Sequence, residues 1–208
     1  MKQTTNTDNQ TQFHEAGTPF GDFASTLHLP RYAELPDIEL YMDQVLTYID
    51  DRLRPLFPAD EKLLTSSMVN NYVKQKLIPT PSHKRYGREH VALLIFICLM
   101  KRTASMADIQ RLFAVQTATH STARAYDFFC TAAEESLRAL FCETTNEHEL
   151  GEWVIGNPEG FAFSLQIEHA DELSLEHRIV ISAATAIANK IYLEKCLELE
   201  DLENNRPL

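Results

Sequence analysis

The stretch TSSMVNNYVKQKLIPTPSHKRY, residues 65–86, decides the fold that we expect for this chain of 208 residues. Thr65 can cap a short helix that runs to about residue 76. The apolar side chains of that helix recur on one side, and its other side carries polar residues, which are Ser66, Ser67, Asn70, Asn71 and Lys74. Pro79 and Pro81 then end the helix and stiffen an extended segment that leads to Tyr86. The stretch therefore predicts a short amphipathic helix followed by a small β-wing.

Helical periodicity continues on both sides of this stretch. Apolar residues from Ile38 to Leu53 recur every three or four positions behind Asp37, which can act as an N-cap, so we expect a helix over 38–53 with an acidic outer face. The same periodicity predicts helices at about 88–102, 105–112, 121–142 and 175–202. In the first of these, five residues are expected to face inward, namely Val91, Leu94, Ile95, Cys98 and Leu99.

Three segments lack this helical pattern. Residues 1–28 are rich in Thr, Gln and Asn, which predicts a disordered or loosely attached tail. Pro30 and Pro36 bracket a short extended segment. Residues 151–168 fit either a β-hairpin or a short helix. We therefore expect a mainly α protein with a tail over 1–28, a winged module with a small β-wing over 29–113 and a helical C-terminal region over 114–208.

The charge of the chain is unevenly distributed. The net charge is −11, which argues against a protein that coats nucleic acid. Between residues 60 and 112, however, nine Lys and Arg residues stand against four acids, which gives +5 there and −16 elsewhere. Such a local excess is typical of a basic footprint on one module.

The predicted 65–76 helix has the side chains that reading a DNA sequence requires. The face that enters the major groove needs small or hydrogen-bonding side chains, and the phosphates on either side need cations and backbone donors. Asn70 and Asn71 can bond base edges, and serines at a helix N-terminus can reach phosphates. The candidate DNA-binding residues are therefore Ser66, Ser67, Asn70, Asn71 and Lys74 of this helix and Lys84 and Arg85 of the wing.

The order of these residues resembles the DNA-binding domain of the MerR family. The landmarks are Thr65, Met68-Val69-Asn70-Asn71-Tyr72, Leu77-Ile78-Pro79, Lys84-Arg85-Tyr86 and Ser105-Met106-Ala107-Asp108-Ile109. More narrowly, residues 29–113 or somewhat beyond look like an uncharacterised bacterial family, a domain of unknown function regarded as MerR-like. The resemblance implies a MerR-like winged helix-turn-helix, sequence-specific binding of double-stranded DNA and a role as a bacterial transcriptional regulator.

Some residues depart from the MerR pattern. Asn70 stands where the family has an Arg on its recognition helix, and Lys76 stands where it has a Gly. The helix expected over 38–53 is also longer and more acidic than its counterpart. These differences leave the operator sequence and the docking angle on DNA open.

Two further questions concern partners. The module could instead be a protein–protein adaptor that reuses a helix-turn-helix without binding DNA. The last helix has a broad apolar face, which favours a homodimer through the C-terminal helices, and this face consists of Ile179, Val180, Ala183, Ala184, Ile187, Ala188 and Ile191. The aromatic residues of the second half, such as Phe128, Trp153 and Phe161, would suit either a pocket for a small-molecule effector or a plain core.

Other classes of function find little support in the sequence. The four cysteines are widely spaced in apolar contexts, which is typical of reduced, buried thiols. Metal-binding and catalytic motifs are missing, so we expect no metal site, no cofactor and no enzymatic activity. Acid pairs such as Glu134-Glu135 are interpreted as solvated helix faces. Neither a signal peptide nor a membrane-spanning run is visible, so we expect a cytoplasmic protein.

Overall fold

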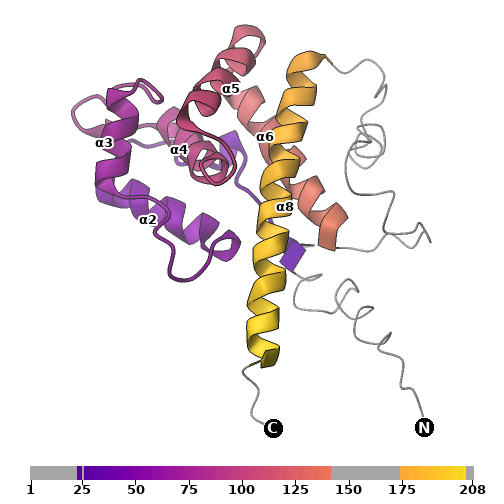
Figure 1. Ribbon diagram of the computed structural model, residues 1–208. Coiled ribbons are helices and arrows are strands. Elements are labelled where there is room, and N and C mark those ends of the chain that lie inside the picture. Colours follow the sequence, from indigo (N-terminus) through magenta and orange to yellow (C-terminus); the bar gives the residue numbers. More distant parts are fainter. Residues whose placement is uncertain (1–22, 25, 142–173, 205–208) are drawn as a thin grey trace, which may run out of the picture.

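The computed structural model describes residues 23–24, 26–141 and 174–204. Within these ranges the protein is mainly helical with a small two-stranded sheet, which confirms the expected fold class at that level (Figure 1). The segment 151–168, predicted as a hairpin or a helix, and most of the tail predicted over 1–28 lie outside the described residues. The elements in chain order are η2 (Tyr32–Glu34), β1 (Leu40–Tyr41), α2 (Met42–Leu53), η3 (Arg54–Leu56), α3 (Ser66–Lys74), β2 (Arg85–Tyr86), α4 (Arg88–Met100), α5 (Met106–Thr119), α6 (Thr122–Phe141) and α8 (Leu175–Asn204).

Helix α4 forms the centre of the core. Nine of its 13 residues are buried, including all five that were predicted to face inward. A helix that is apolar all round must be enclosed by other elements, and α2, α6, α8 and β2 all pack against α4. Its Phe96 ring lies 4.8 Å from that of Phe113 on α5 and 4.6 Å from that of Phe129 on α6, measured between ring centres. These contacts join the first helices of the chain to the later ones.

Helix α2 begins later than the sequence predicts. It starts at Met42 rather than at Ile38, so Asp37 is not its N-cap. Strand β1 precedes it and pairs antiparallel with β2, and this pairing draws the backbone away from a helical path. The prediction that Ile38 and Tyr41 lie on a buried helix face is therefore wrong, because they are 65% and 52% exposed. At the helix start, the Tyr41 N–H donates to Gln44 Oε1 at 2.9 Å.

Helix α3 has the start that the sequence predicts and an end that is set by local geometry. Thr65 Oγ1 accepts the Met68 N–H at 3.2 Å, which confirms the N-cap. At the other end, Lys76 has a φ of 58°, and its N–H donates to the Val73 carbonyl at 3.0 Å. The following N–H, of Leu77, donates to the Tyr72 carbonyl at 2.9 Å. These bonds form a Schellman motif, with Lys76 in the left-handed position that usually holds glycine.

Helix α5 is longer than predicted. It starts behind Ser105, whose Oγ accepts the Asp108 N–H at 3.2 Å, as expected of a cap, but it runs to Thr119 rather than to about 112. Neither Gly nor Pro occurs between Leu112 and the end of the helix, so nothing in this part of the sequence interrupts it. The boundary predicted after residue 113 thus falls inside α5.

Helices α6 and α8 agree closely with the predicted segments and pack against each other along their length (Figure 1). The two run in the same direction, and near their first turns the His177 ring of α8 lies 4.9 Å from the Phe128 ring of α6. The apolar face of α8 that the sequence offered for a homodimer is largely turned inward. Its buried members are Val180, Ala184, Ile187, Ala188 and Ile191.

The segment that precedes α2 is tied to α6 by polar contacts. Glu134 is 2% exposed, so its interpretation as part of a solvated face is wrong. Its Oε1 accepts a hydrogen bond from the Leu29 N–H at 2.6 Å. Arg31 donates from Nη1 to Oε1 at 2.8 Å and from Nη2 to Oε2 at 2.7 Å. Tyr126 Oη donates to the Pro30 carbonyl at 2.9 Å nearby. A bidentate contact of this kind allows a charged side chain to be buried on an otherwise apolar helix face.

Candidate nucleic-acid interface

The outer face of α3 holds five of the seven candidate residues. Val69 and Tyr72 are buried beneath the helix, and the five residues Ser66, Ser67, Asn70, Asn71 and Lys74 are all exposed. At 100° per residue, Ser67 and Lys74 lie farthest from the buried side, with Asn70 and Asn71 on either flank. None of these five side chains forms a hydrogen bond with another residue that the structure describes. The face is therefore polar, and its side chains are small in the first half of the helix. It is free to accept an external ligand.

Cations hold the loop that leads into α3. Lys101 Nζ donates to the Leu63 carbonyl at 2.6 Å, two residues before the cap. Arg54 donates to the Glu61 carbonyl at 2.9 Å, and Arg102 donates to the Leu56 carbonyl at 2.9 Å. Because these side chains satisfy backbone carbonyls of η3 and of the loop after it, they fix the position of α3. They are thereby less available to bind phosphates.

The predicted wing is a tight turn. His83 and Lys84 both have positive φ, 50° and 60°, and the Arg85 N–H donates to the Ser82 carbonyl at 2.8 Å. Two consecutive left-handed residues closed by such a bond define a type I′ turn, the form that joins adjacent antiparallel strands. His83 and Lys84 are exposed at its tip. The chain between α3 and α4 loops out beside the end of α3 (Figure 1).

Arg85 is held by a residue that sequence reasoning missed. Its Nη2 donates to Tyr41 Oη at 2.8 Å, and its guanidinium carbon lies 4.6 Å from the centre of the Tyr41 ring. Tyr41 reaches this position because β1 pairs with β2, with Tyr41 opposite Arg85. A two-residue strand 44 positions away in sequence gives no local signal, and the residue fitted a helical pattern equally well. The contact orients Arg85 and leaves other N–H groups of its guanidinium for an external acceptor.

The cations that are accessible to a ligand occupy a shorter stretch than residues 60–112, and that stretch contains no acidic residue. No acidic residue occurs over the 27 positions from Lys62 to Arg88, which include six cations. Four of these are exposed lysines, namely Lys62, Lys74, Lys76 and Lys84. Of the cations counted farther along, Arg111 lies 3.8 Å from Asp108, and Lys101 and Arg102 bind backbone carbonyls. The positive charge available to a ligand is therefore concentrated on α3 and the turn that follows it.

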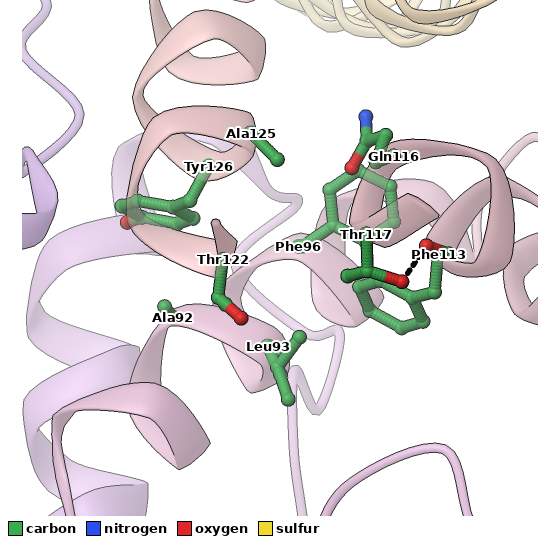
Figure 2. Close-up of a pocket in the computed structure, with 9 residues that line it drawn as sticks. All are labelled: Ala92, Leu93, Phe96, Phe113, Gln116, Thr117, Thr122, Ala125 and Tyr126. Atoms are coloured by element: carbon green, nitrogen blue, oxygen red, sulfur yellow. Dashed lines mark hydrogen bonds between the residues drawn. The ribbon is translucent and has the colours of Figure 1, made fainter. Parts of the chain in front are cut away.

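A small cavity lies between α4, α5 and α6 (Figure 2). Phe96, Phe113 and Tyr126 contribute aromatic walls, and the buried Gln116 side chain lies at one edge with its Nε2 unpaired among the described residues. The space, about 10 Å³, holds roughly one water molecule. An effector needs several hundred Å³, so this cavity does not serve as the small-molecule pocket considered from the sequence. Trp153 and Phe161, also considered for a pocket, lie outside the described residues.

His90 lies behind the turn at the start of α4. Its Nδ1 accepts the Gly87 N–H at 3.1 Å, and its ring packs edge-on against Tyr86 with centres 5.5 Å apart. Burial lowers the pKa of His90, although nearby Glu89 and backbone hydrogen bonds act against this shift. The ring is therefore neutral at physiological pH and supports β2 rather than adding a charge to the surface.

Metal binding and membrane insertion receive no structural support within the described ranges. There, no three His, Cys, Asp or Glu side chains gather closely enough to hold a metal ion. Burial raises the pKa of the Cys98 and Cys130 thiols to about 12, which matches the expected inert, reduced cysteines. Cys142 lies outside the described ranges. None of the helices in these ranges is long and apolar enough to cross a membrane.

One comparison with known proteins finds a match over part of the chain. Residues 30–129 match the model of a family described as Domain of unknown function (DUF1836). The match agrees with the expected uncharacterised family, begins beside the Arg31 contact and ends inside α6. It therefore includes α3, the turn and Tyr41. No curated protein and no solved structure matches the chain.

Proposed function

We propose that this protein binds double-stranded DNA sequence-specifically and acts as a bacterial transcriptional regulator with no enzymatic activity. The observation that carries the proposal is the exposed polar face of α3, lying within 27 residues that contain six cations and no acid. In a chain with a net charge of −11, such a face is the part suited to approach a polyanion.

The arrangement of elements supports a MerR-like winged helix-turn-helix. The chain passes through β1, α2, α3, the Ser82–Arg85 turn with β2, and α4, and a winged module needs a supporting helix, a recognition helix and a wing in that order. In this proposal α3 enters the major groove and the turn follows the phosphates. Lys76 takes the left-handed position at the end of α3, where the MerR pattern has a glycine.

Each candidate residue then has a distinct role. Ser66 and Ser67, at the N-terminus of α3, bind a phosphate together with backbone N–H groups. Asn70 and Asn71 face base edges, and Lys74 and Lys84 neutralise phosphates. Arg85, oriented by Tyr41, is the bidentate donor of the turn.

The salt dependence of binding tests this proposal. We expect the full-length protein to bind a pool of random duplexes at about 50 mM salt and to lose affinity steeply toward 200 mM, because phosphate contacts release counterions. Lys74→Ala and Lys84→Ala should each reduce the slope of log K against log salt by about one. Fluorescence anisotropy with a labelled duplex measures both quantities.

A matched control comes from α8. Lys195 pairs with Glu198 at 2.8 Å and lies away from the candidate face, so Lys195→Ala should leave the slope unchanged. Absence of binding to random DNA at low salt would contradict the proposal. Equal effects of all three alanine variants would assign the salt dependence to net charge rather than to this face.

One observation favours the alternative of a protein–protein adaptor. Ile38 is 65% exposed and lies between Asp37 and Glu39, which are also exposed. An exposed apolar side chain flanked by two carboxylates suits a protein partner better than DNA, whose phosphates repel acidic groups. In the strand pairing, Tyr41 lies opposite Arg85, so Ile38 is at the end of the pair away from the turn. If the adaptor reading holds, Ile38→Ser abolishes partner binding and the salt slope on DNA is absent.

The proposed regulator is a homodimer through its C-terminal helices. Because most of the apolar face predicted for this contact is buried, the dimer must use another face of α8, where Leu193 and Leu197 are about half exposed one turn apart. Light scattering at micromolar concentration measures the oligomeric state, and a clean monomer would contradict this part of the proposal.

A further inference from the structure

The middle of α3 presents two asparagine amides to the solvent. Asn70 and Asn71 are exposed, and neither amide bonds to another residue that the structure describes. They lie on either side of the line from Ser67 to Lys74 that marks the outermost part of the helix. Two adjacent amides in these positions can each meet a base edge when this face enters a groove. No internal contact competes for either one.

The chemistry of these side chains is selective among bases. An asparagine amide offers one donor and one acceptor, which matches N7 and N6 of adenine in the major groove. Guanine presents two acceptors there and is read by two donors, usually from an arginine. Helix α3 contains no arginine, and the guanidinium nearest along the sequence, that of Arg85, belongs to the turn, which follows the phosphates in the proposed function. Ser66 and Ser67 can bond to any base or to phosphate.

Lys74 does not alter this selectivity in the middle of the helix. It is the last residue of α3, about one turn beyond the asparagines. A lysine at the far end of the helix binds as a point charge and not as the fork of two donors that an arginine presents to guanine.

We infer that Asn70 and Asn71 make α3 a reader of adenine, so that the base pairs beneath the middle of the helix are A·T. This inference rests on the proposed function, since it names the sequence class that the same face would select. It also gives a physical consequence to the asparagine that stands where the MerR pattern has an arginine.

Selection from random duplexes tests the inference directly. The full-length protein should enrich, from a pool with a random core of about 16 base pairs, sites with at least two neighbouring A·T pairs. Replacing the selected adenines by 7-deazaadenine, which removes only the N7 acceptor, should weaken binding about tenfold. Asn70→Ala and Asn71→Ala should each lower the preference for the selected duplex over its G·C-substituted version about tenfold, or 1.4 kcal/mol.

Lys84→Ala is the matched control, because loss of a phosphate contact lowers affinity for both duplexes equally. Both asparagines are exposed, so thermal unfolding of their alanine variants should match that of the parent. Enrichment of G·C pairs, indifference to 7-deazaadenine, or undiminished preference in both alanine variants would overturn the inference and leave the proposed function standing. Failure to bind any duplex at low salt would overturn both.

Discussion

Two adjacent glutamates of α6 have very different surroundings. Glu134 is buried and accepts hydrogen bonds from Leu29 and Arg31, whereas Glu135 is about one-third exposed and pairs with Arg138. Burial by itself raises the pKa of Glu134, but the hydrogen bonds from Arg31 and from the Leu29 N–H outweigh burial and hold that pKa below its ordinary value. The carboxylate is therefore charged at neutral pH and binds the N-terminal segment to α6.

Removing this charge should destabilise the fold. We expect Glu134→Gln to lower the free energy of unfolding by about 3 kcal/mol at pH 7, because Arg31 loses its buried counter-charge. Urea denaturation measures the difference. Glu135→Gln is the neighbouring control and should change stability by less than about 1 kcal/mol, as is usual for exposed ion pairs. Equal effects of the two substitutions would contradict this account.

The same pair of variants has a defined pH dependence. A carboxyl group whose pKa is lowered in the folded state contributes stability above its unfolded pKa, and that contribution is lost as the pH falls through the folded pKa. The unfolded value is 4.5, so the gap between the parent and Glu134→Gln should be full above about pH 5 and should narrow below pH 4.5. A gap that stays constant down to pH 3 would assign the effect to packing instead.

At the scale of elements, the end of α3 combines a favourable hydrogen-bond pattern with an unfavourable residue. The Schellman motif requires a left-handed residue, and Lys76 adopts φ 58° there. A side chain with a Cβ in this region costs about 1 kcal/mol relative to glycine. The motif therefore sets where α3 ends, even though the sequence lacks the residue that normally marks such an end.

Glycine should relieve this cost. We expect Lys76→Gly to raise the free energy of unfolding by about 0.5–1 kcal/mol, measured by urea or thermal unfolding. Gln75→Gly is the matched control one residue earlier, where φ is −80° and glycine has no steric advantage, so it should lower stability. The explanation fails if both substitutions lower stability to a similar extent.

At the scale of the whole molecule, Arg102 connects three parts of the chain that are distant in sequence. It follows α4, donates to the Leu56 carbonyl at 2.9 Å and lies 4.3 Å above the centre of the Phe57 ring. It also forms an ion pair with Glu194 of α8, where both side chains are largely buried. These contacts fix α8 relative to the loop that leads into α3. The core shared by the described residues likewise includes side chains from Leu29 to Ile191.

Loss of the Arg102–Glu194 pair should therefore lower the stability of the whole fold. We expect Glu194→Gln to lower the free energy of unfolding by about 3 kcal/mol, since a buried guanidinium is left without its counter-charge. Glu198→Gln, one turn farther along α8, removes the pair between Lys195 and a carboxylate that is 43% exposed, and it should cost less than about 1 kcal/mol. Urea denaturation of both variants measures these differences. If Glu194→Gln leaves the free energy of unfolding almost unchanged, apolar packing alone holds α8 in place.

Much of the helical framework was determined by the sequence alone. Residues such as Thr65 and Ser105 mark helix starts, and the 3.6-residue period of apolar side chains identified α3, α4, α6 and α8, because these signals act within one or two turns. The exposed polar face of α3 followed from the same period. The start of α2 was misplaced, since Ile38 and Tyr41 fit a helical period equally well.

Only the tertiary structure decided which side chains meet. Tyr41 orients Arg85 across 44 positions, and Arg31 allows Glu134 to be buried across 103. A pattern within a single element carries no record of such distant partners. The physical reason is that burial of a charge and the pairing of a two-residue strand depend on what packs opposite them, and that is fixed only when the whole chain folds.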